Sequence, residues 1–286
     1  MKTLRHHVIL YDAECPLCRV YTSAFVHSGM LDAGGRKPYQ DQQAIAACPL
    51  LDRQRAVNEI ALIDTRTGQV TYGIDSLLKV ICTAFPALRI LLSPRPIVWF
   101  LKKAYAFVSY NRRVIIPGAA ATVNGKKPDL SEVGLQPGFR LHYRIAFLLF
   151  AWLLTAFILS RYAIFMKPLV PPGPWYREYL LCGAQMLFQG TLLLSLGNIN
   201  RTRHCFWNYL GNLMTVSFAG ALALLLPLLI GVVLNAKPAF FLVSFLLVAA
   251  ALFAEHLRRT RLLHLPALLS CGWLLYRLLI CIYVLQ

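Results

Sequence analysis

Acidic residues are scarce in this chain of 286 residues, and they are distributed unevenly. Asp and Glu number 12, and only Glu178 and Glu255 of these lie in residues 141–286. Charged residues make up 14% of the chain, against roughly 25% in an average soluble protein. This shortage excludes an ordinary soluble domain for the second half of the chain. It also indicates a change of composition near residue 141.

Two further features are missing. The N-terminal sequence MKTLRHHVILYDAEC has a basic start, but its apolar stretch is too short for the core of a signal peptide. The net charge is +17, but the basic residues form neither a basic face with interleaved aromatics nor a recognisable nucleic-acid-binding module. We therefore expect no export through a signal peptide and no nucleic-acid partner.

Long apolar segments dominate the second half of the chain. A helix needs about 20 residues to cross the hydrocarbon core of a bilayer. Five segments are long enough: residues 144–165, 178–197, 207–234, 238–256 and 265–285. Pro227 inside the third segment is expected to kink its helix rather than end it. We predict an all-α transmembrane bundle of about five spans over residues 141–286, with the lipid bilayer as a partner.

Basic residues at the ends of these segments indicate an orientation, because they are enriched on the cytoplasmic side. With the N-terminal domain in the cytoplasm, 11 basic residues lie inside and four outside. The inner set is Arg112, Arg113, Lys126, Lys127, Arg140, Arg144, Arg201, Arg203, Arg258, Arg259 and Arg261, and the outer set is Arg161, Lys167, Arg177 and Lys237. We expect a multi-pass protein of the inner or plasma membrane of a bacterial-type cell, with a cytoplasmic N-terminal domain.

A Cys-x-x-Cys motif lies near the start of the chain. Residues 7–12 (HVILYD) form an apolar, β-prone run, and the motif leads into RVYTSAFVHSGML, which has helical periodicity. At the start of a helix, Cys15 would be favoured as a thiolate by unpaired N–H groups and the helix dipole. Cys18 lies one turn further, close enough to form a disulfide with Cys15 or to resolve a mixed one. The pattern predicts thiol–disulfide chemistry.

Further elements are predicted between this motif and the apolar segments. EIALID (59–64) and QVTYG (69–73) predict a β-hairpin, and residues 75–85 predict a helix. Together with the first strand and helix, they form a minimal thioredoxin-like layout. Segment 94–113 is amphipathic and basic, so it could lie on the membrane surface. We predict three parts: a domain over residues 1–117, a linker over 118–140, and the membrane domain over 141–286.

The stretch from Tyr11 to Cys18 (YDAECPLC) resembles the signature of the DCC family of thiol–disulfide oxidoreductases. The family's closing helix, which contains tyrosine and runs into an Asn-Arg pair, is matched by Tyr105, Tyr110, Asn111 and Arg112, and Gly73 fits its step into the helix after the hairpin. The resemblance covers roughly residues 6–117 and none of the membrane half. It implies that segment 94–113 is a packing helix of this domain, which is compatible with a place beside the bilayer. It implies an α/β thioredoxin-like fold with Cys15 as the attacking thiol, Cys18 as the resolving thiol and Asp12 as their catalytic neighbour.

These assignments have alternatives. Cys15 and Cys18 could be inert or could be half of a zinc site, which needs two more ligands. The available candidates, none of which forms a second pair of suitable spacing, are Cys48, Cys82, His6 and His7. Asp12 could accept the proton of Cys18 or only cap the following turn. Cys48 and Cys82 are predicted to be core residues. No cofactor-binding or metal-binding residue is assigned.

Polar residues inside the predicted spans point to function or to helix packing, because they are costly in hydrocarbon. Two pairs lie one turn apart, and interhelical hydrogen bonds explain them: Gln185 with Gln189, and Asn208 with Asn212. Arg277 lies inside the fifth span, and its side chain could extend to the outer face. Glu255 is expected at the opposite end, so the two are not paired.

Several histidines and cysteines fall in or near the predicted spans. His204, Cys205, His256 and His264 lie near cytoplasmic ends of spans, and Cys271 lies about two turns into the fifth. The simplest interpretation makes them interfacial residues. Alternatively, Cys205 or Cys271 exchanges electrons with the Cys15–Cys18 pair, or the histidines bind a metal, haem or quinone.

The sequence thus predicts a membrane-bound thiol–disulfide oxidoreductase. Because the cytoplasm keeps dithiols reduced, we expect it to reduce a protein or small-molecule disulfide, or another oxidised thiol, there. A membrane protein is a further candidate partner. Two alternatives come from other classes: a small membrane carrier or channel with the CxxC domain as a redox gate, and a membrane scaffold with structural cysteines.

Overall fold

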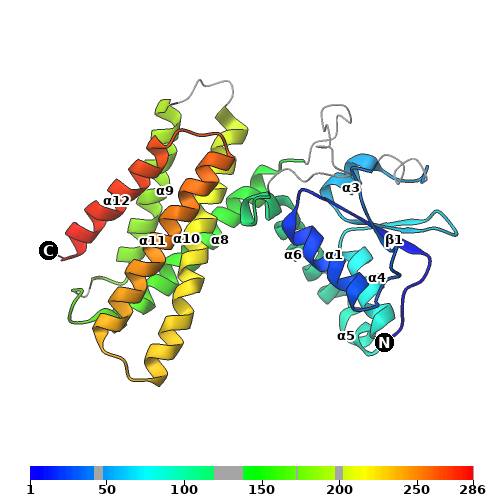
Figure 1. The fold of residues 1–286 in the computed structure, drawn as a ribbon, viewed down its shortest axis with the longest axis horizontal. Coiled ribbons are helices and arrows are strands. Elements are labelled where there is room, and N and C mark those ends of the chain that lie inside the picture. The colour runs from blue at the N-terminus through cyan, green and yellow to red at the C-terminus, as the bar shows by residue number, and fades with distance from the viewer. Residues whose placement is uncertain (42–47, 119–137, 172, 197–201, 286) are drawn as a thin grey trace. The chain divides into compact units, whose positions relative to one another are not determined.

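The structure, a computed structural model, describes residues 1–41, 48–118, 138–171, 173–196 and 202–285. The chain divides into two compact units, which we call the N-terminal unit (Met1–Tyr143) and the C-terminal unit (Arg144–Gln286) (Figure 1). This division falls within the first turn of helix α8 (Leu141–Ala163). Most of the predicted linker, residues 119–137, lies outside the described residues.

The described part of the N-terminal unit contains a four-stranded mixed sheet in the order β2-β1-β3-β4. Its strands are β1 (His7–Tyr11), β2 (Arg36–Pro38), β3 (Ala61–Asp64) and β4 (Val70–Tyr72). β1 and β2 are parallel and are joined through α1 (Pro16–His27), whereas β3 is antiparallel to both β1 and β4. The first strand, the helix after the motif and the β-hairpin are confirmed.

Helices cover both faces of this sheet. Ile9 and Leu62 pack into one cluster with side chains of α1, α4 (Ile74–Ala84) and α6 (Arg95–Ile115). Leu10 and Ile63 pack into another cluster with α3 (Arg53–Asn58). Because successive side chains of a strand point to opposite faces, each of these strands contributes to both cores. The result is a helix–sheet–helix arrangement of three layers.

Three short elements were not predicted from the sequence: β2, α3 and α5 (Ala87–Leu92). β2 has the sequence Arg-Lys-Pro, without apolar alternation, and it exists because its backbone pairs with residues Ile9 to Tyr11 of β1. The predicted helix over residues 75–85 is present as α4, and Gly73 is its N-cap residue with a φ of 62°. Glycine is the residue that adopts this left-handed conformation without steric cost.

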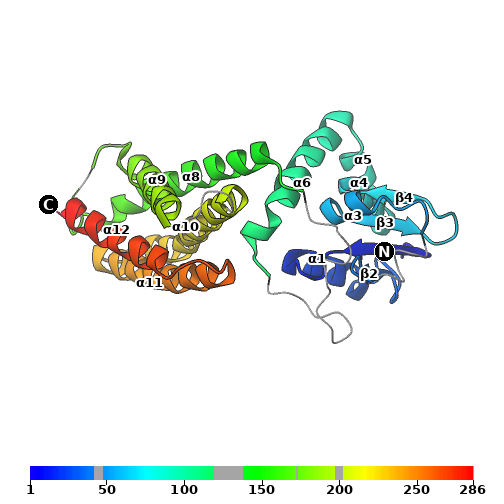
Figure 2. The ribbon, with the colours of Figure 1, turned by 90° about the horizontal axis from the view of Figure 1, so that it is seen from above.

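The C-terminal unit is helical (Figure 2). Its elements are α8, the short 3-10 helix η1 (Ile164–Met166), α9 (Arg177–Leu196), α10 (Thr202–Val233), α11 (Pro238–Leu262) and α12 (Leu268–Leu285). Within the described residues, four helices are long and apolar enough to cross a membrane: Leu141–Met166, Arg177–Leu196, His204–Val233 and Pro238–Leu262. The fifth predicted segment forms a shorter apolar helix, Leu268–Val284. As predicted, α10 continues through Pro227.

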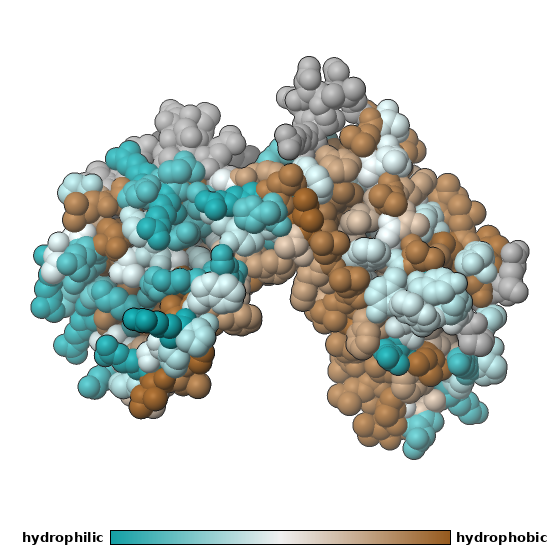
Figure 3. All heavy atoms as spheres, turned by 180° about the vertical axis from the view of Figure 1, so that it is seen from behind, coloured by the Kyte–Doolittle hydropathy of each residue, from teal (hydrophilic) through white to brown (hydrophobic). Residues whose placement is uncertain are grey.

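Apolar side chains cover much of the face of this unit that Figure 3 shows. Leu226, Leu229, Val233 and Leu247 are each more than 60% exposed. A surface of this kind is unfavourable in water, whereas hydrocarbon tails solvate it. Together with the four long apolar helices, it indicates a multi-pass membrane protein in a lipid bilayer.

Candidate functional site

The Cys-x-x-Cys motif lies at the junction of β1 and α1. Cys15 is the N-cap residue of α1, and Pro16 is the first residue of the helix, a position where its missing N–H has no intrahelical partner to lose. The Cys15 sulfur accepts a hydrogen bond from the backbone N–H of Cys18 at 3.4 Å. Cys15 is 2% exposed and Cys18 is 3% exposed, so the protein shields both thiols from bulk water.

The two thiols interact directly and unequally. A side-chain hydrogen bond from Cys18 lowers the pKa of Cys15 to about 6, and the backbone N–H of Cys18 and the charge of Arg112 act in the same direction against burial. The same side-chain contact, together with burial, raises the pKa of Cys18. A hydrogen bond from Tyr21 and the charge of Arg112 partly oppose that rise in the pKa of Cys18. The pair therefore holds its negative charge on Cys15 and its proton on Cys18.

Asp12 caps the turn that contains the motif. Its carboxylate atom Oδ1 accepts hydrogen bonds from the backbone N–H of Glu14 at 3.1 Å and from Nε2 of Gln40 at 3.0 Å. Gln40 also accepts a hydrogen bond from the backbone N–H of Ala13 at 3.2 Å. These contacts support the capping interpretation and fix the loop between β1 and Cys15.

Two arginines of α6 donate hydrogen bonds to Oδ2, the other carboxylate oxygen of Asp12. Arg112 Nη2 donates to Oδ2 at 3.1 Å, and Arg113 Nη2 donates to it at 3.3 Å. Arg112 is itself buried and also donates to the carbonyl oxygen of Val57 at 2.8 Å. Proton transfer from Cys18 to Asp12 stays a prediction, and none of the hydrogen bonds described for Asp12 involves Cys18.

The sequence did not predict most of the residues that surround the two cysteines and Asp12. Arg112 was named for its charge near the membrane half and for the Asn-Arg pair, but not as a partner of Asp12, because their ion pair joins residues that are 100 positions apart. Gln40 carries no motif that would have marked it. Tyr21 lies one turn after Cys18 in the segment with helical periodicity, which was the available signal. Asn111 has a structural role: its Nδ2 donates to the carbonyl oxygens of Phe107 at 2.9 Å and Tyr143 at 3.0 Å.

The alternative of a zinc site gains no ligands from the described residues, where no group of three or more His, Cys, Asp or Glu side chains could hold a metal ion. Cys48 is buried in the cluster beneath α3, as predicted for a core residue. Cys82 is only half-buried. His7 is buried, and its Nδ1 lies 2.8 Å from the carbonyl oxygen of Arg5.

A separate polar cluster lies inside the C-terminal unit. The Tyr209 hydroxyl is 2.7 Å from the side-chain amide of Gln189 and 3.3 Å from Nε2 of His256. On its other side, His256 Nδ1 is 3.0 Å from the hydroxyl oxygen of Ser270. These four residues belong to α9, α10, α11 and α12. His256 is 2% exposed, and hydrogen bonds to neighbouring helices hold it inside the bundle. Its place at a membrane interface concerns depth in the bilayer and stays a prediction.

Interhelical hydrogen bonds also explain the two asparagines. Arg259 Nη1 donates to Asn212 Oδ1 at 3.0 Å, and Arg144 Nη2 donates to Asn208 Oδ1 at 3.3 Å. Gln185 differs from its neighbour Gln189, because its buried Nε2 has no hydrogen-bond partner among the described residues. The packing interpretation is therefore confirmed for three of the four amides.

The remaining candidates of the C-terminal unit do not gather around His256. His204 and His264 are exposed, Cys205 is half-buried and Cys271 is exposed. The three histidines thus have different surroundings, which gives no support to a shared metal, haem or quinone site. Exchange of electrons between Cys205 or Cys271 and the Cys15–Cys18 pair stays a prediction.

No family model, curated protein or solved structure matches this chain. The local geometry therefore carries the functional argument. That geometry is a shielded pair of unequal thiols at the start of a helix, braced by a buried ion pair.

Proposed function

We propose that the protein is a membrane-bound thiol–disulfide oxidoreductase of the DCC type, with Cys15 as the attacking thiol and Cys18 as the resolving thiol. One observation carries the proposal: the hydrogen-bonded pair of cysteines at the start of α1, in which Cys15 ionises more readily. The mixed sheet with its antiparallel third strand, covered by helices on both faces, supports a thioredoxin-like fold for the N-terminal unit.

The reaction transfers two electrons. The Cys15 thiolate attacks one sulfur of a substrate disulfide, a Cys15–substrate bond forms, and the other half of the substrate leaves as a thiolate that takes up a proton. Cys18 then loses its proton to water and attacks the Cys15 sulfur. A Cys15–Cys18 disulfide forms, and the second substrate thiolate leaves. A cytoplasmic thiol reductant returns both electrons by reducing this disulfide.

The surroundings of Cys18 suit its later role. The contact with Cys15 is the main reason for the raised pKa of Cys18, and this cause weakens once Cys15 is bound covalently to substrate. The charge of Arg112 and the hydrogen bond from Tyr21 then remain, and both favour the Cys18 thiolate. Asp12 acts as a positioning residue in this scheme, because it holds Arg112 beside the two thiols.

The C-terminal unit anchors this chemistry to the bilayer in the proposal. Basic residues at the span ends favour a cytoplasmic N-terminal unit, and a bacterial-type inner or plasma membrane fits that arrangement. The substrate is then a cytoplasmic disulfide or another oxidised thiol, presented by a small molecule, a soluble protein or a neighbouring membrane protein.

Trapping tests the proposal directly. In the full chain, Cys18→Ser removes the resolving thiol, so a mixed disulfide on Cys15 should accumulate and be identified by mass spectrometry after gentle lysis with thiol blocking. Cys48→Ser changes another buried cysteine of the same unit and should trap nothing. An absence of any adduct on Cys15 in the Cys18→Ser protein would count against the enzyme. Phenotypes that survive both Cys15→Ser and Cys18→Ser would favour a scaffold.

A further inference from the structure

A largely apolar, partly open cavity of about 300 Å³ lies between helices of the C-terminal unit. Its wall comes from four helices, α8, α9, α11 and α12, and from residues just after α8. The apolar part of the wall includes Leu159, Met166, Leu242, Phe245, Ile280 and Val284. Three charged side chains also line it: Arg177, Glu178 and Arg277.

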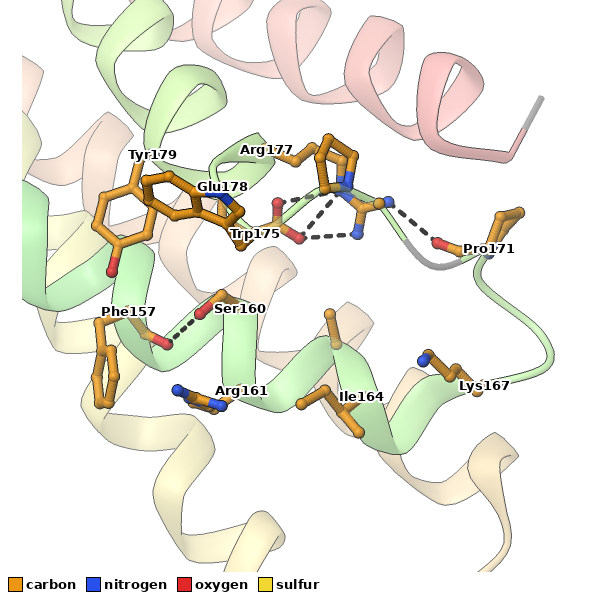
Figure 4. A pocket seen from close by; sticks show the side chains of 13 residues that line it. Phe157, Ser160, Arg161, Ile164, Lys167, Pro171, Trp175, Arg177, Glu178 and Tyr179 are labelled. Atoms are coloured by element: carbon orange, nitrogen blue, oxygen red, sulfur yellow. Dashed lines mark hydrogen bonds and ion pairs between the residues drawn. The ribbon is translucent and has the colours of Figure 1, made fainter.

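Two of these three charges neutralise each other. Arg177 Nη2 donates to Glu178 Oε1 at 2.8 Å, and Arg177 Nε lies 3.1 Å from Oε2 of the same carboxylate. Arg177 also donates to the carbonyl oxygen of Pro171 at 3.0 Å. Figure 4 shows this pair in an adjoining pocket that shares Arg177 and Glu178 with the cavity. The ion pair therefore contributes almost no net charge to the cavity wall.

Among the described residues of its unit, Arg277 has no acidic partner. Residues 144–286 contain only two acids: Glu178 is paired with Arg177, and Glu255 is paired with Arg258 at 2.6 Å and Arg259 at 2.7 Å. The Nε atom of Arg277 is buried and has no hydrogen-bond partner among the described residues. Its Cζ lies 5.2 Å from the centre of the Trp273 ring, a contact that stabilises a cation but does not neutralise it.

An uncompensated cation within a membrane-spanning bundle is unfavourable, because low-dielectric surroundings replace its hydration. An anion placed against Arg277 would remove that penalty and satisfy Nε. A small hydrated anion would gain nothing from the apolar wall, whereas an anion with an apolar chain would contact both parts of the cavity. The cavity thus has a charged part that suits an anionic group and an apolar part that suits a hydrocarbon chain.

We propose that this cavity binds an amphipathic organic anion, an apolar chain that ends in a carboxylate or a phosphate, with the anionic group against Arg277. This binding function is independent of the thiol chemistry of the N-terminal unit. The bilayer can supply such a molecule as a lipid, and the cell can supply it as a free acid or phosphate monoester.

The test uses the full chain in nanodiscs of phosphatidylcholine, which has no net charge, with dodecanoate, dodecyl phosphate and the neutral dodecanol as probes. We expect saturable binding of the two anions and no saturable binding of dodecanol. Arg277→Gln should weaken binding of dodecanoate by about tenfold or more, because a charge-assisted hydrogen bond is lost. Arg277→Lys should lose less, and the matched control Arg161→Gln, in the adjoining pocket, should stay within about twofold.

Thermal unfolding supplies a second readout. Dodecanoate should raise the unfolding midpoint of the wild-type protein but not that of Arg277→Gln. If Arg277→Gln does not fold, Leu159→Trp fills the cavity with Arg277 left in place and should abolish binding. Equal affinity for dodecanoate and dodecanol, or equal affinity of wild type and Arg277→Gln for dodecanoate, would overturn the proposal.

Native mass spectrometry of the purified protein distinguishes the two sources. A bound phospholipid that Arg277→Gln loses supports supply from the bilayer, and a bound free acid or phosphate monoester supports supply from the cell. A protein that carries no such molecule and also fails to bind dodecanoate contradicts the site.

Discussion

Cys15 owes most of its acidity to the residue three positions further along the chain. The sequence suggested unpaired N–H groups and the helix dipole as the causes. In the structure, the largest cause is the hydrogen bond from the Cys18 side chain, and the backbone N–H of Cys18 contributes further. The motif spacing matters for this reason: it puts both the thiol and the N–H of Cys18 within reach of the Cys15 sulfur.

The pH dependence of alkylation tests this explanation. Cys15 reacts as a thiolate, so its rate of reaction with iodoacetamide, followed by mass spectrometry, should rise with a midpoint near pH 6. Cys18→Ala removes the thiol hydrogen bond and should raise this midpoint by about one pH unit or more. Cys48→Ala should leave the midpoint unchanged. A wild-type midpoint near 9, the value of an ordinary thiol, would refute the hydrogen-bonded pair.

The ion pair of Asp12 with Arg112 should matter for the stability of the N-terminal unit. Asp12→Asn leaves the guanidinium of Arg112 buried without its carboxylate, which should lower the free energy of unfolding by about 3 kcal/mol. Pulse proteolysis or hydrogen exchange of the full chain measures this loss. Asp75→Asn breaks an exposed pair with Lys102 and should cost less than about 1 kcal/mol. Equal effects of the two substitutions would show that Asp12 and Arg112 do not stabilise the unit.

At the scale of elements, periodic segments were predictable and contact-dependent ones were not. Ile9 and Leu62 lie in strands with clear apolar patterns, and the first turn of α1 followed from Cys15 and Pro16. β2 depends on backbone pairing with β1, which leaves no trace in its side chains. Helix α6 was expected from the sequence. The contact of its Arg112 with Asp12 was not, because it depends on how α6 packs in the tertiary fold.

The chain just after α6 lies against the motif loop. A Cβ atom added to Gly118 would overlap the backbone oxygen of Glu14 and lie 3.0 Å from Cδ of Pro16. Gly118→Leu should therefore displace this segment and raise the alkylation rate of Cys15 several-fold, with the midpoint pH unchanged. Gly34→Leu is a matched control, because nothing lies within 4 Å of a Cβ at that position. An unchanged rate would mean that residue 118 does not shield Cys15.

At the scale of the whole molecule, the two units differ in composition because one is surrounded by water and the other by lipid. The N-terminal unit buries apolar strand residues between helices on both faces of a sheet, and the C-terminal unit exposes leucine and valine on long helices. The helices of the membrane half could therefore be predicted from the lengths of the apolar segments. The exception is α12, which is shorter than the predicted span. The burial of His256 depends on how the helices pack, so span length did not predict it.

A single-turnover reaction tests the central claim most directly. Reduced full-length protein is mixed with oxidised glutathione, and released thiol and bound glutathione are counted. The wild-type protein should release two thiols per disulfide consumed and end with a Cys15–Cys18 disulfide. Cys18→Ser should release one thiol and keep glutathione on Cys15, and Cys15→Ser should release none. The assignment of the two cysteines would be contradicted if Cys15→Ser released as much thiol as the wild-type protein. It would also be contradicted if the wild-type protein retained glutathione on Cys18.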